Sequence, residues 1–558
     1  MAPSEQRNLT CRKRICVIGA GTAGLVAAKV ALEEGEGAEV VCLERAADLG
    51  GIWWYRPNEM EQTTVMEFTV TNTSKEMSAF SDYPPSASLP AYLPHRDMLA
   101  YLKDYARAFG VREIIRFNSV VEQVSKMDDG RWRVVVKDIL TNTVTSEVFD
   151  AVMVCIGHHS IPRSPRFQDQ HLFKGRIIHG KVFKNSDGYR GKRVAVVGFG
   201  NSAVDIAISL TGLADQVYIS VRCGTWIYPS HSGGVPLDYA MVRRLTQSMP
   251  SIVRNFVLDS FMQRCFNHDI VGLTPEHSVA SQMGTVNDQL PRALLAKQIR
   301  LMPPIQRFTE SGVIFEDSDE CVPVDEVILA TGYRPDIPFV DSKYYGKCTT
   351  EGDVDRLLLF KGMYSLCDDS IVFLGMIDAQ GNLGQLFEMQ ARHFMAVYSG
   401  RVRLPERESE RMEAVAQNIA AIKATFVGDS HRHAIMVDKM RYMDNLAEDM
   451  GVKPNWWTML IRDPQLALRC LVGPLLPYQY RLIGPYAWAG AREAIMTAES
   501  RQMASLQPKK PLPRTANRLH GPHSRSIRFS AVFVIISVCL LLSSIVIGSG
   551  VAWKTSYL

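Results

Sequence analysis

The sequence has no CxxC pair, little net charge and no apolar stretch near its start. Its eleven cysteines are scattered and odd in number, which argues against a disulfide framework and a zinc site, so we expect reduced thiols and no metal. A net charge of +4, without basic residues interleaved with aromatics, excludes nucleic acid as a partner. The start lacks the apolar core of a secretory signal, which predicts a cytosolic body.

Extremes of composition are lacking as well. Hydrophobic residues make up 46% of the chain and charged residues 22%, which are ordinary globular values. These values exclude a protein that is disordered throughout, a collagen and a coiled-coil rod. The 558 residues correspond to about three or four structural units. The chain is therefore long enough to bury large cores.

Residues 529–553 contain no charged side chain. A helix needs about 20 residues to span the hydrocarbon core of a bilayer, so this segment predicts a transmembrane tail anchor. Basic residues precede it between 509 and 528, and only Lys554 follows it, which predicts a cytoplasmic body. Residues 506–528 form a basic linker that we expect to lie near anionic headgroups of the lipid bilayer.

Two parts of the sequence repeat one pattern: a short apolar run, a glycine-rich turn, a helix-like segment and a second β-branched run. This is the βαβ pattern of a parallel doubly wound sheet, so the sequence predicts an α/β protein with two Rossmann-like dinucleotide-binding domains. The runs and turns are Arg14–Ile18, GAGTAG at 19–24 and EVVCLE at 39–44 in the first unit, and Arg193–Val197, GFGNSA at 198–203 and QVYISVR at 216–222 in the second.

The first turn carries a dinucleotide fingerprint. Gly19 lets the chain leave the strand tightly, Gly21 lets a pyrophosphate approach the backbone, and Gly24 lets the helix pack on the strand. The helix N-terminus offers free N–H groups to the phosphates. Glu44 lies 20 residues beyond Gly24, where an acid accepts hydrogen bonds from ribose hydroxyls. The alternative for Glu44 is an exposed acid at a strand end.

The second turn differs at two places. Ala203 replaces the third glycine, which the fingerprint allows. Val221 stands where the first unit has Glu44, and Arg222 follows it. An acid would repel a 2′-phosphate, whereas arginine offers it a planar charged partner, so this turn favours NADPH over NADH. The alternative is that Arg222 only ends a strand at the surface.

Two dinucleotide sites predict two cofactors, and the usual pair is a tightly held flavin with an exchanging nicotinamide. Strand-like segments at 152–159 and 327–336 are suited to carry the chain out of the flavin domain and back, which predicts that the NADPH domain is inserted in the flavin domain. The FAD-binding domain is predicted to consist of residues 1–165 and 330–505, and its second part includes a substrate- and membrane-associated region. The NADPH-binding domain is predicted at 166–329, the basic linker at 506–528 and the tail anchor at 529–553.

Several further motifs follow one another along the body of the chain. They are LGGIW at 49–53, TNTSKEM at 71–77, FKGRIIHGKVF at 173–183, which fits FxGxxxHxxx(Y/F), NDQLP at 287–291 and LATGYRPD at 329–336. With these motifs the sequence resembles the flavin-containing monooxygenases over about residues 14–500. It is most similar to the membrane-bound vertebrate type, such as dimethylaniline monooxygenase (N-oxide-forming), which implies the endoplasmic reticulum membrane.

The resemblance implies an oxidoreductase of small lipophilic compounds, xenobiotics included. NADPH reduces FAD, O2 adds to the reduced flavin, and the resulting C4a-hydroperoxyflavin passes one oxygen to a soft nitrogen or sulfur centre. Bound NADP+ shields that species from water. The cofactor carries the chemistry while the protein orients the reactants and excludes water. This division of labour explains why no catalytic triad or metal cluster stands out in the sequence.

The resemblance also implies roles for individual residues. Asn72 is the catalytic candidate, because its amide has two donors and an acceptor with which to hold the oxygenated flavin and NADP+. The alternative is that Asn72 only makes a turn. The expected cofactor contacts are Gly19, Ala20, Gly21, Thr22, Ala23, Gly24 and Glu44 for the FAD pyrophosphate and ribose, Ile52, Trp53, Thr71, Asn72 and Thr73 near the flavin, and Gly198, Gly200, Asn201, Ser202, Ala203, Val204, Asp205 and Arg222 for NADPH.

Three histidines need an interpretation. His179 lies in the FKGRIIHGKVF motif, and we interpret it as a linker residue that positions the NADPH domain rather than as a catalytic group. His158 and His159 follow a strand, but without nearby cysteines or acids we expect no metal there.

Departures from the family pattern leave the substrate open. Phe183 stands where dedicated Baeyer–Villiger enzymes have tryptophan, whereas SQM at 281–283 lacks the charged pair of typical heteroatom-oxidising members. DAQ at 378–380 differs from what the resemblance implies for a loop that faces the flavin. Oxygen insertion beside a ketone therefore remains an alternative to nitrogen or sulfur oxygenation. A flavin disulfide reductase and a non-enzymatic NADPH sensor are weaker alternatives. The oligomeric state, a homo-oligomer included, is left open.

Overall fold

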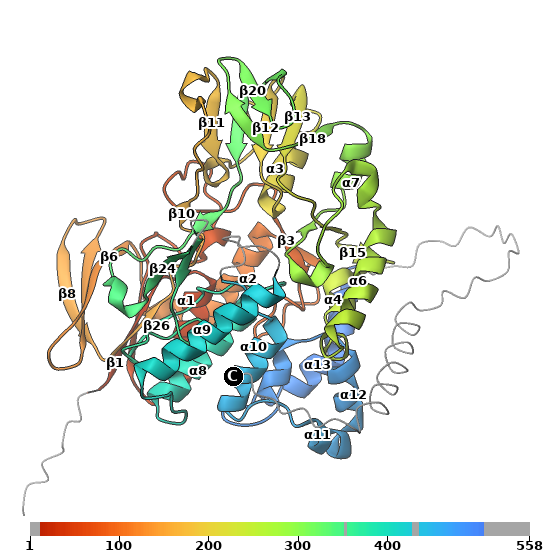
Figure 1. The fold of residues 1–558 in the computed structure, drawn as a ribbon. Coiled ribbons are helices and arrows are strands. Elements are labelled where there is room, and N and C mark those ends of the chain that lie inside the picture. Colours follow the sequence, from red (N-terminus) through yellow and green to blue (C-terminus); the bar gives the residue numbers. More distant parts are fainter. Residues whose placement is uncertain (1–11, 351–353, 427–434, 507–558) are drawn as a thin grey trace, which may run out of the picture.

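Two five-stranded sheets organise the chain (Figure 1). The computed structural model describes residues 12–350, 354–426 and 435–506. The first sheet has the strand order β26-β9-β1-β2-β5 and the second the order β11-β22-β12-β13-β18, and neighbouring strands are parallel in both. The α/β class is confirmed, and both predicted βαβ units are present.

The first sheet is covered by helices that pack closely. Helix α1 (Thr22–Glu34) connects β1 to β2, and nearly all of its residues are buried, because the helix lies between the sheet and α8 (Gly384–Tyr398). Its small alanine side chains let these elements approach one another. The strands are β1 Arg14–Ile18, β2 Glu39–Leu43, β5 Ile115–Arg116, β9 Ala151–Val154 and β26 Ile371–Phe373.

The second sheet repeats this arrangement with α3 (Asn201–Leu210) between β12 and β13. Its strands are hydrophobic on both faces, as expected for a parallel sheet with both faces covered. They are β11 Arg176–His179, β12 Arg193–Val197, β13 Gln216–Ser220, β18 Ile299–Met302 and β22 Glu326–Leu329.

The second sheet is inserted in the first. All its strands lie in the sequence between β9 and β26 of the first sheet. The chain leaves and returns side by side, because β10 (Ile161–Pro162) pairs antiparallel with β23 (Tyr333–Arg334). The insertion predicted from the two crossing segments is therefore present, and the residue boundaries of the predicted domains stay a prediction.

Smaller elements surround the two sheets. The remaining helices are α2 His95–Ala108, α4 Leu237–Met241, α5 Arg244–Gln247, α6 Ser251–Cys265, α7 Leu290–Leu295, α9 Glu408–Thr425, α10 Lys439–Asp449, α11 Trp456–Arg462, α12 Pro464–Val472 and α13 Ala491–Ala504. The smaller sheets contain β3 Val70–Ser74 with β4 Tyr92–Pro94, β6 Ser119–Lys126 with β7 Trp132–Asp138 and β8 Val144–Phe149, β14 Ile227–Tyr228 with β17 Thr285–Val286, β15 His231–Ser232 with β16 Val235–Pro236, β19 Ile305–Phe308 with β20 Gly312–Phe315 and β21 Cys321–Pro323, and β24 Lys347–Thr350 with β25 Val354–Leu357.

The C-terminal helices α11, α12 and α13 gather at the lower right of Figure 1, away from the second sheet at the top. Helix α12 packs against both α11 and α13. Within the described ranges, no helix combines the length and the apolar character that crossing a membrane requires. The predicted anchor at 529–553 and the linker before it lie outside these ranges, apart from Leu506.

Candidate functional site

A cavity of about 1940 Å³ lies between the two sheets, where their strands end. Ligands of doubly wound folds bind in this crevice at the carboxyl ends of the strands. Both glycine-rich turns line it. The predicted cofactor-binding residues in its lining are Gly19, Gly21, Thr22, Ala23, Glu44, Ile52, Trp53, Thr71, Asn72, Gly198, Gly200, Asn201, Ser202, Ala203, Asp205 and Arg222. The predicted residues outside its lining are Ala20, Gly24, Thr73 and Val204.

Two of these four residues, Thr73 and Val204, are buried next to residues that line the cavity. The hydroxyl of Thr73 lies 2.8 Å from the hydroxyl of Ser78, and both residues are buried. Val204 is fully buried in the core that joins α3 to the second sheet. Their side chains therefore fix the position of neighbouring residues that do line the cavity.

The first turn has the geometry that a pyrophosphate needs. Gly19 has φ +102°, and an added Cβ there would lie 2.7 Å from the carbonyl oxygen of Cys155. At Gly24 an added Cβ would lie 1.7 Å from the carbonyl oxygen of Gly19. Gly21 faces the cavity, and a Cβ there would meet only the backbone of Gly51, at 3.5 Å. Gly19 and Gly24 thus have no room for a side chain, whereas the approach of a pyrophosphate at Gly21 stays a prediction.

Glu44 sits at the end of β2 and is buried. One carboxylate oxygen accepts a hydrogen bond from the N–H of Ala20 at 2.6 Å, and the other accepts one from the N–H of Ala46 at 2.8 Å. Burial raises the pKa of Glu44, while these two donors and nearby arginines act in the opposite direction. Because each oxygen can accept a second bond, the cavity-facing carboxylate fits ribose hydroxyls.

The second turn repeats this construction. Gly198 has φ +114°, and an added Cβ would lie 2.6 Å from the carbonyl oxygen of Ala330. The side-chain oxygen of Asn201 accepts a hydrogen bond from the N–H of Val286 at 2.9 Å, which ties the first turn of α3 to the strand before the NDQLP motif. Arg222 follows β13 and is exposed at the cavity, where it can reach a phosphate.

An acid with a shifted pKa lies beside this turn. Burial raises the pKa of Asp205 to about 6, and the amide of Asn287, which donates to the carboxylate at 3.4 Å, opposes the shift. Asp205 lines the cavity on α3. The charge next to the second turn therefore changes close to neutral pH.

Asn72 lies in an irregular part of β3, where the register with β4 shifts between Val70 and Ser74. The hydroxyl of Thr71 accepts a hydrogen bond from the N–H of Leu93 at 2.9 Å. Within the irregularity this side chain therefore takes the place of a backbone carbonyl as the partner of β4. Such bulges re-aim side chains next to active sites. The side chain of Asn72 is exposed, lines the cavity and has no hydrogen-bond partner among the described residues. It therefore makes none of the local bonds that a turn-forming asparagine would make.

The histidines lie where the chain crosses between the sheets. The rings of His158 and His159 are 4.1 Å apart, and Tyr333 lies 5.3 Å from His159 and 5.2 Å from His179. His179 also contacts the carbonyl oxygen of Gly332 at 3.1 Å. No cluster of metal-ligating side chains occurs in the part of the chain that the structure describes. His179 thus packs on the returning segment, as a linker residue would.

Sequence reasoning missed a contact that reaches the site from helix α4, which lies in the sequence between β13 and β18 of the inserted sheet. The carboxylate of Asp238, on α4, accepts hydrogen bonds from the N–H of Ser74 at 2.7 Å and from its hydroxyl at 3.1 Å. Ser74 ends the strand that carries Asn72. No motif marks Asp238, because the two residues are far apart in the sequence and only folding brings them together.

Comparisons with known proteins agree with this geometry. Residues 12–545 match the family described as flavin-binding monooxygenase-like. The chain belongs to this family. It is 37% identical to flavin-containing monooxygenase 5 of Cavia porcellus over 88% of its length and 92% of the relative's. It is 35% identical to dimethylaniline monooxygenase (N-oxide-forming) 2 of Pan troglodytes over 89% and 93%. The structure of S-allyl-L-cysteine S-oxygenase from Allium sativum has the same fold, with a TM-score of 0.59, 23% identity and coverage of 87% and 99%.

As a flavin-binding monooxygenase-like protein, the chain is an FAD-dependent NADPH monooxygenase. Membership sets aside the disulfide-reductase and sensor alternatives. The residues present fit both cofactors. Gly21 and Gly200 line one cavity and have no side chain to block it. Glu44 stands at the end of β2 in the first unit, and Arg222 follows β13 in the second. The cavity volume of about 1940 Å³ exceeds the roughly 300–1,000 Å³ of an ordinary small-molecule pocket, which leaves room for more than one ligand.

Proposed function

We propose that this enzyme oxygenates soft nitrogen or sulfur centres of small lipophilic compounds. NADPH supplies two electrons, one atom of O2 enters the substrate and the other leaves as water. Bound FAD supplies the chemistry that accepts hydride and activates O2. The observation that carries the proposal is the position of Asn72, whose amide lines the cavity and has no hydrogen-bond partner among the residues that the structure describes. The names of the N-oxide-forming relative and of the S-oxygenase of like fold support the substrate class.

The two turns hold the cofactors in this proposal. The backbone at Gly21 and the N-terminus of α1 receive the FAD pyrophosphate, and Glu44 accepts the ribose hydroxyls. Gly200 and the N-terminus of α3 receive the nicotinamide dinucleotide. Arg222 binds its 2′-phosphate, because a guanidinium matches phosphate geometry.

Asn72 serves as the catalytic residue. Its N–H2 group can donate while its oxygen accepts, so this one side chain would be able to hold both cofactors in the cavity that it lines. A preorganised donor of this kind stabilises developing charge without reorganisation. No acid–base pair is required from the chain, since the cofactor provides the reactive oxygen.

The wall of the cavity that Asn72 lines suits a lipophilic substrate. Val70 and Ile52 line the cavity with 48% and 40% of their surfaces exposed, and Trp53 lines it as well. Apolar side chains at an open cavity wall are covered when an apolar ligand binds, which is favourable. The same surfaces exclude water from the reaction.

The test compares two substrates under one set of conditions. Purified enzyme is given NADPH with an aryl alkyl sulfide or with a cyclic ketone, while O2 uptake and products are measured. We expect a sulfoxide in proportion to NADPH consumed and little lactone. Lactone as the main product would favour the ketone alternative. Absence of any oxygenated product from either substrate and from a tertiary amine would contradict the proposed substrate class.

We also propose that the enzyme is held at the endoplasmic reticulum membrane with its body in the cytoplasm. The support is the uncharged sequence at 529–553 with basic residues before it. A second support comes from the exposed apolar residues of α11 and α12, such as Trp457, Ile461 and Leu468, beside basic Arg462 and Arg469. Aromatic and basic side chains together are typical of a surface that meets lipid headgroups.

A further inference from the structure

The turn that follows β3 is tied to the C-terminal helix by a buried ion pair. The carboxylate of Glu76 is fully buried, and the guanidinium of Arg501 on α13 binds it with two parallel hydrogen bonds of 2.8 Å. Arg501 itself is only 16% exposed. Fork-to-fork pairs of this kind restrict geometry as well as adding energy.

Neighbouring groups complete the pair. The hydroxyl of Tyr478 donates to the same carboxylate at 3.1 Å, and the side-chain oxygen of Gln502 accepts the N–H of Glu76 at 3.3 Å. The guanidinium of Arg501 also donates to the carbonyl oxygen of Ala494 within its own helix at 2.8 Å. Both partners are thereby held by several bonds, so the turn and α13 form one rigid contact.

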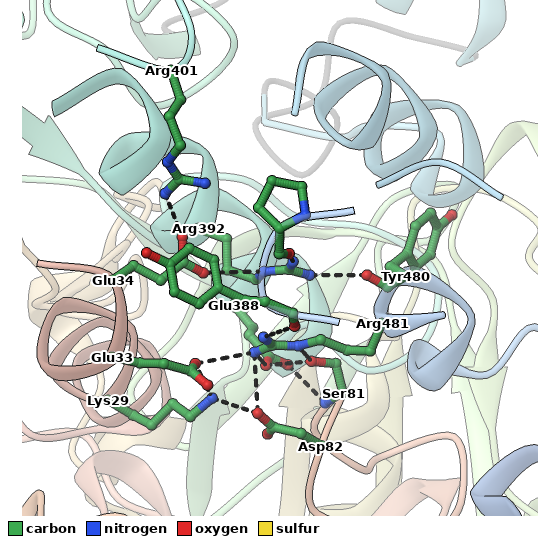
Figure 2. A network of polar contacts seen from close by, with 12 residues as sticks. Lys29, Glu33, Glu34, Ser81, Asp82, Glu388, Arg392, Arg401, Tyr480 and Arg481 are labelled. Carbon is green, nitrogen blue, oxygen red and sulfur yellow. Dashed lines mark hydrogen bonds and ion pairs between the residues drawn. The ribbon is translucent and has the colours of Figure 1, made fainter. Parts of the chain in front are cut away.

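A second buried network fixes the far end of the same segment (Figure 2). The guanidinium of Arg481 donates to the hydroxyl of Ser81 at 2.7 Å and lies 3.1 Å from Asp82 and 3.2 Å from Glu388. Lys29 on α1 also pairs with Asp82. Together with the Asp238 contact at Ser74, these interactions hold the segment 74–82 at its start, middle and end.

We propose that Arg501 is a positioning residue for Asn72. Because the side chain of Asn72 has no protein partner among the described residues, the backbone alone decides where its amide points. That backbone continues from the irregular strand β3 directly into the turn that Glu76 anchors. Removing Arg501 leaves a buried carboxylate without its counter-ion and with Tyr478 still donating to it, which favours movement of the turn, entry of water or uptake of a proton. The inference rests on the proposed role of Asn72.

The consequence is a link between the C-terminal helices and the coupling of the reaction. A displacement of about 1 Å at a positioning group can cost up to about a hundredfold in rate. Loss of the Arg501 pair should therefore make oxygen leave as hydrogen peroxide instead of entering the substrate. A role in stability alone predicts a lower melting temperature with unchanged products per flavin.

The experiment compares Arg501→Ala, Arg501→Lys and Tyr478→Phe with wild type in the full-length, flavin-loaded enzyme. Flavin content, melting temperature and the ratio of peroxide to sulfoxide are measured for each. Arg492→Ala is the matched control, because Arg492 lies on the same helix, is 53% exposed and pairs with Asp463 at 2.6 Å. We expect the ratio to rise about five- to twentyfold in Arg501→Ala, less in Arg501→Lys, about twofold in Tyr478→Phe and not at all in the control.

A double variant separates positioning from stability. If Arg501 acts through Asn72, adding Arg501→Ala to Asn72→Ala should raise the ratio little further, because coupled effects are not additive. A wild-type ratio of peroxide to sulfoxide in a folded Arg501→Ala enzyme would overturn the inference. It would also be overturned if the effects of Asn72→Ala and Arg501→Ala on this ratio were fully additive in the double variant. If that variant does not fold, unchanged ratios in Arg501→Lys and Tyr478→Phe overturn it instead. An unchanged ratio in Asn72→Ala alone would contradict the proposed role of Asn72 and not merely that of Arg501.

Discussion

Gly21 and Gly200 stand at equivalent positions of the two turns, each directly before its helix, with φ of −75° and −79°. Any residue can adopt these angles, and both glycines line the cavity, so a larger side chain at either place would take up space in it. Gly198 differs, since its φ of +114° and its distance to Ala330 make every side chain strained. Gly21 and Gly200 therefore form a matched pair for assigning the two cofactor sites.

Gly21→Val and Gly200→Val should fail in different ways. A valine side chain takes the space of the pyrophosphate in each turn. We expect Gly21→Val to purify without flavin and Gly200→Val to stay yellow but to be reduced slowly by NADPH. Absorbance spectra of the purified proteins and anaerobic reduction rates check this. A colourless Gly200→Val beside a yellow Gly21→Val would reverse the assignment.

Arg222→Ala should weaken NADPH much more than NADH. A charge-assisted contact to the 2′-phosphate contributes about 1.5–3 kcal/mol, which is roughly a ten- to hundredfold loss of affinity for NADPH. Binding of NADP+ and NAD+ to the flavin-loaded enzyme measures the difference. Arg300→Ala, an exposed arginine on the neighbouring strand β18, is the control. If NADP+ and NAD+ lost affinity equally, the proposed contact of Arg222 with the 2′-phosphate would be wrong.

Asn72→Ala should uncouple the reaction while leaving FAD bound. The pyrophosphate contacts lie elsewhere, so flavin content should stay near wild type. Losing one or two hydrogen bonds of about 1–1.5 kcal/mol each predicts roughly a five- to hundredfold rise in peroxide relative to product. Peroxide and sulfoxide are measured on flavin-loaded protein. A lower melting temperature with an unchanged ratio would mean that Asn72 only shapes the chain.

Asp205→Asn should change how stability depends on pH. The pKa of Asp205 in the folded protein, about 6, lies above its ordinary value near 3.8, so the folded state holds the proton more tightly than the unfolded chain. Stability from this group is therefore greatest below pH 3.8 and is lost as pH rises through 6. We expect Asp205→Asn to melt roughly 1–3 °C above wild type at pH 7.5 and about half as far above it at pH 5, because the unfolded chain already loses this proton above pH 3.8. The melting temperatures of both proteins are measured against pH without NADP+. A difference between them that does not change with pH would contradict the raised pKa of Asp205.

An enzyme ending at Leu506 should fold, carry flavin and still bind vesicles in part. The exposed residues Trp457 and Ile461, at 78% and 82% exposure, offer an apolar surface that lipid can cover. Replacing both by serine should lower co-sedimentation with anionic vesicles. Leu140→Ser, at a site of 77% exposure on the β7–β8 hairpin, should not. Full solubility of the truncated protein with no vesicle binding would contradict this membrane surface.

The sequence alone determined the two βαβ units and the glycines that have no room for a side chain. Strand, turn and helix lie within about 30 residues, so the constraints on Gly19 or Gly198 are local and leave a readable pattern. The family resemblance singled out Asn72. Only the tertiary structure decided that Asn72 lies at an irregularity of β3 and has no hydrogen-bond partner within the described ranges. It also decided that Thr73, two residues from Thr71, is not part of the cavity lining.

The tertiary structure also decided which distant charges meet. Glu76 and Arg501 are 425 residues apart, and Ser74 and Asp238 are 164 apart. Such pairs have no spacing or periodicity that a sequence can display, because a buried charge selects its partner by position in space and by the cost of leaving it unpaired. The glycine-rich turns can be read from the sequence because their constraints act within the local backbone. The support of β3, the strand that carries Asn72, arises only when the C-terminal helices pack against the turn that follows it.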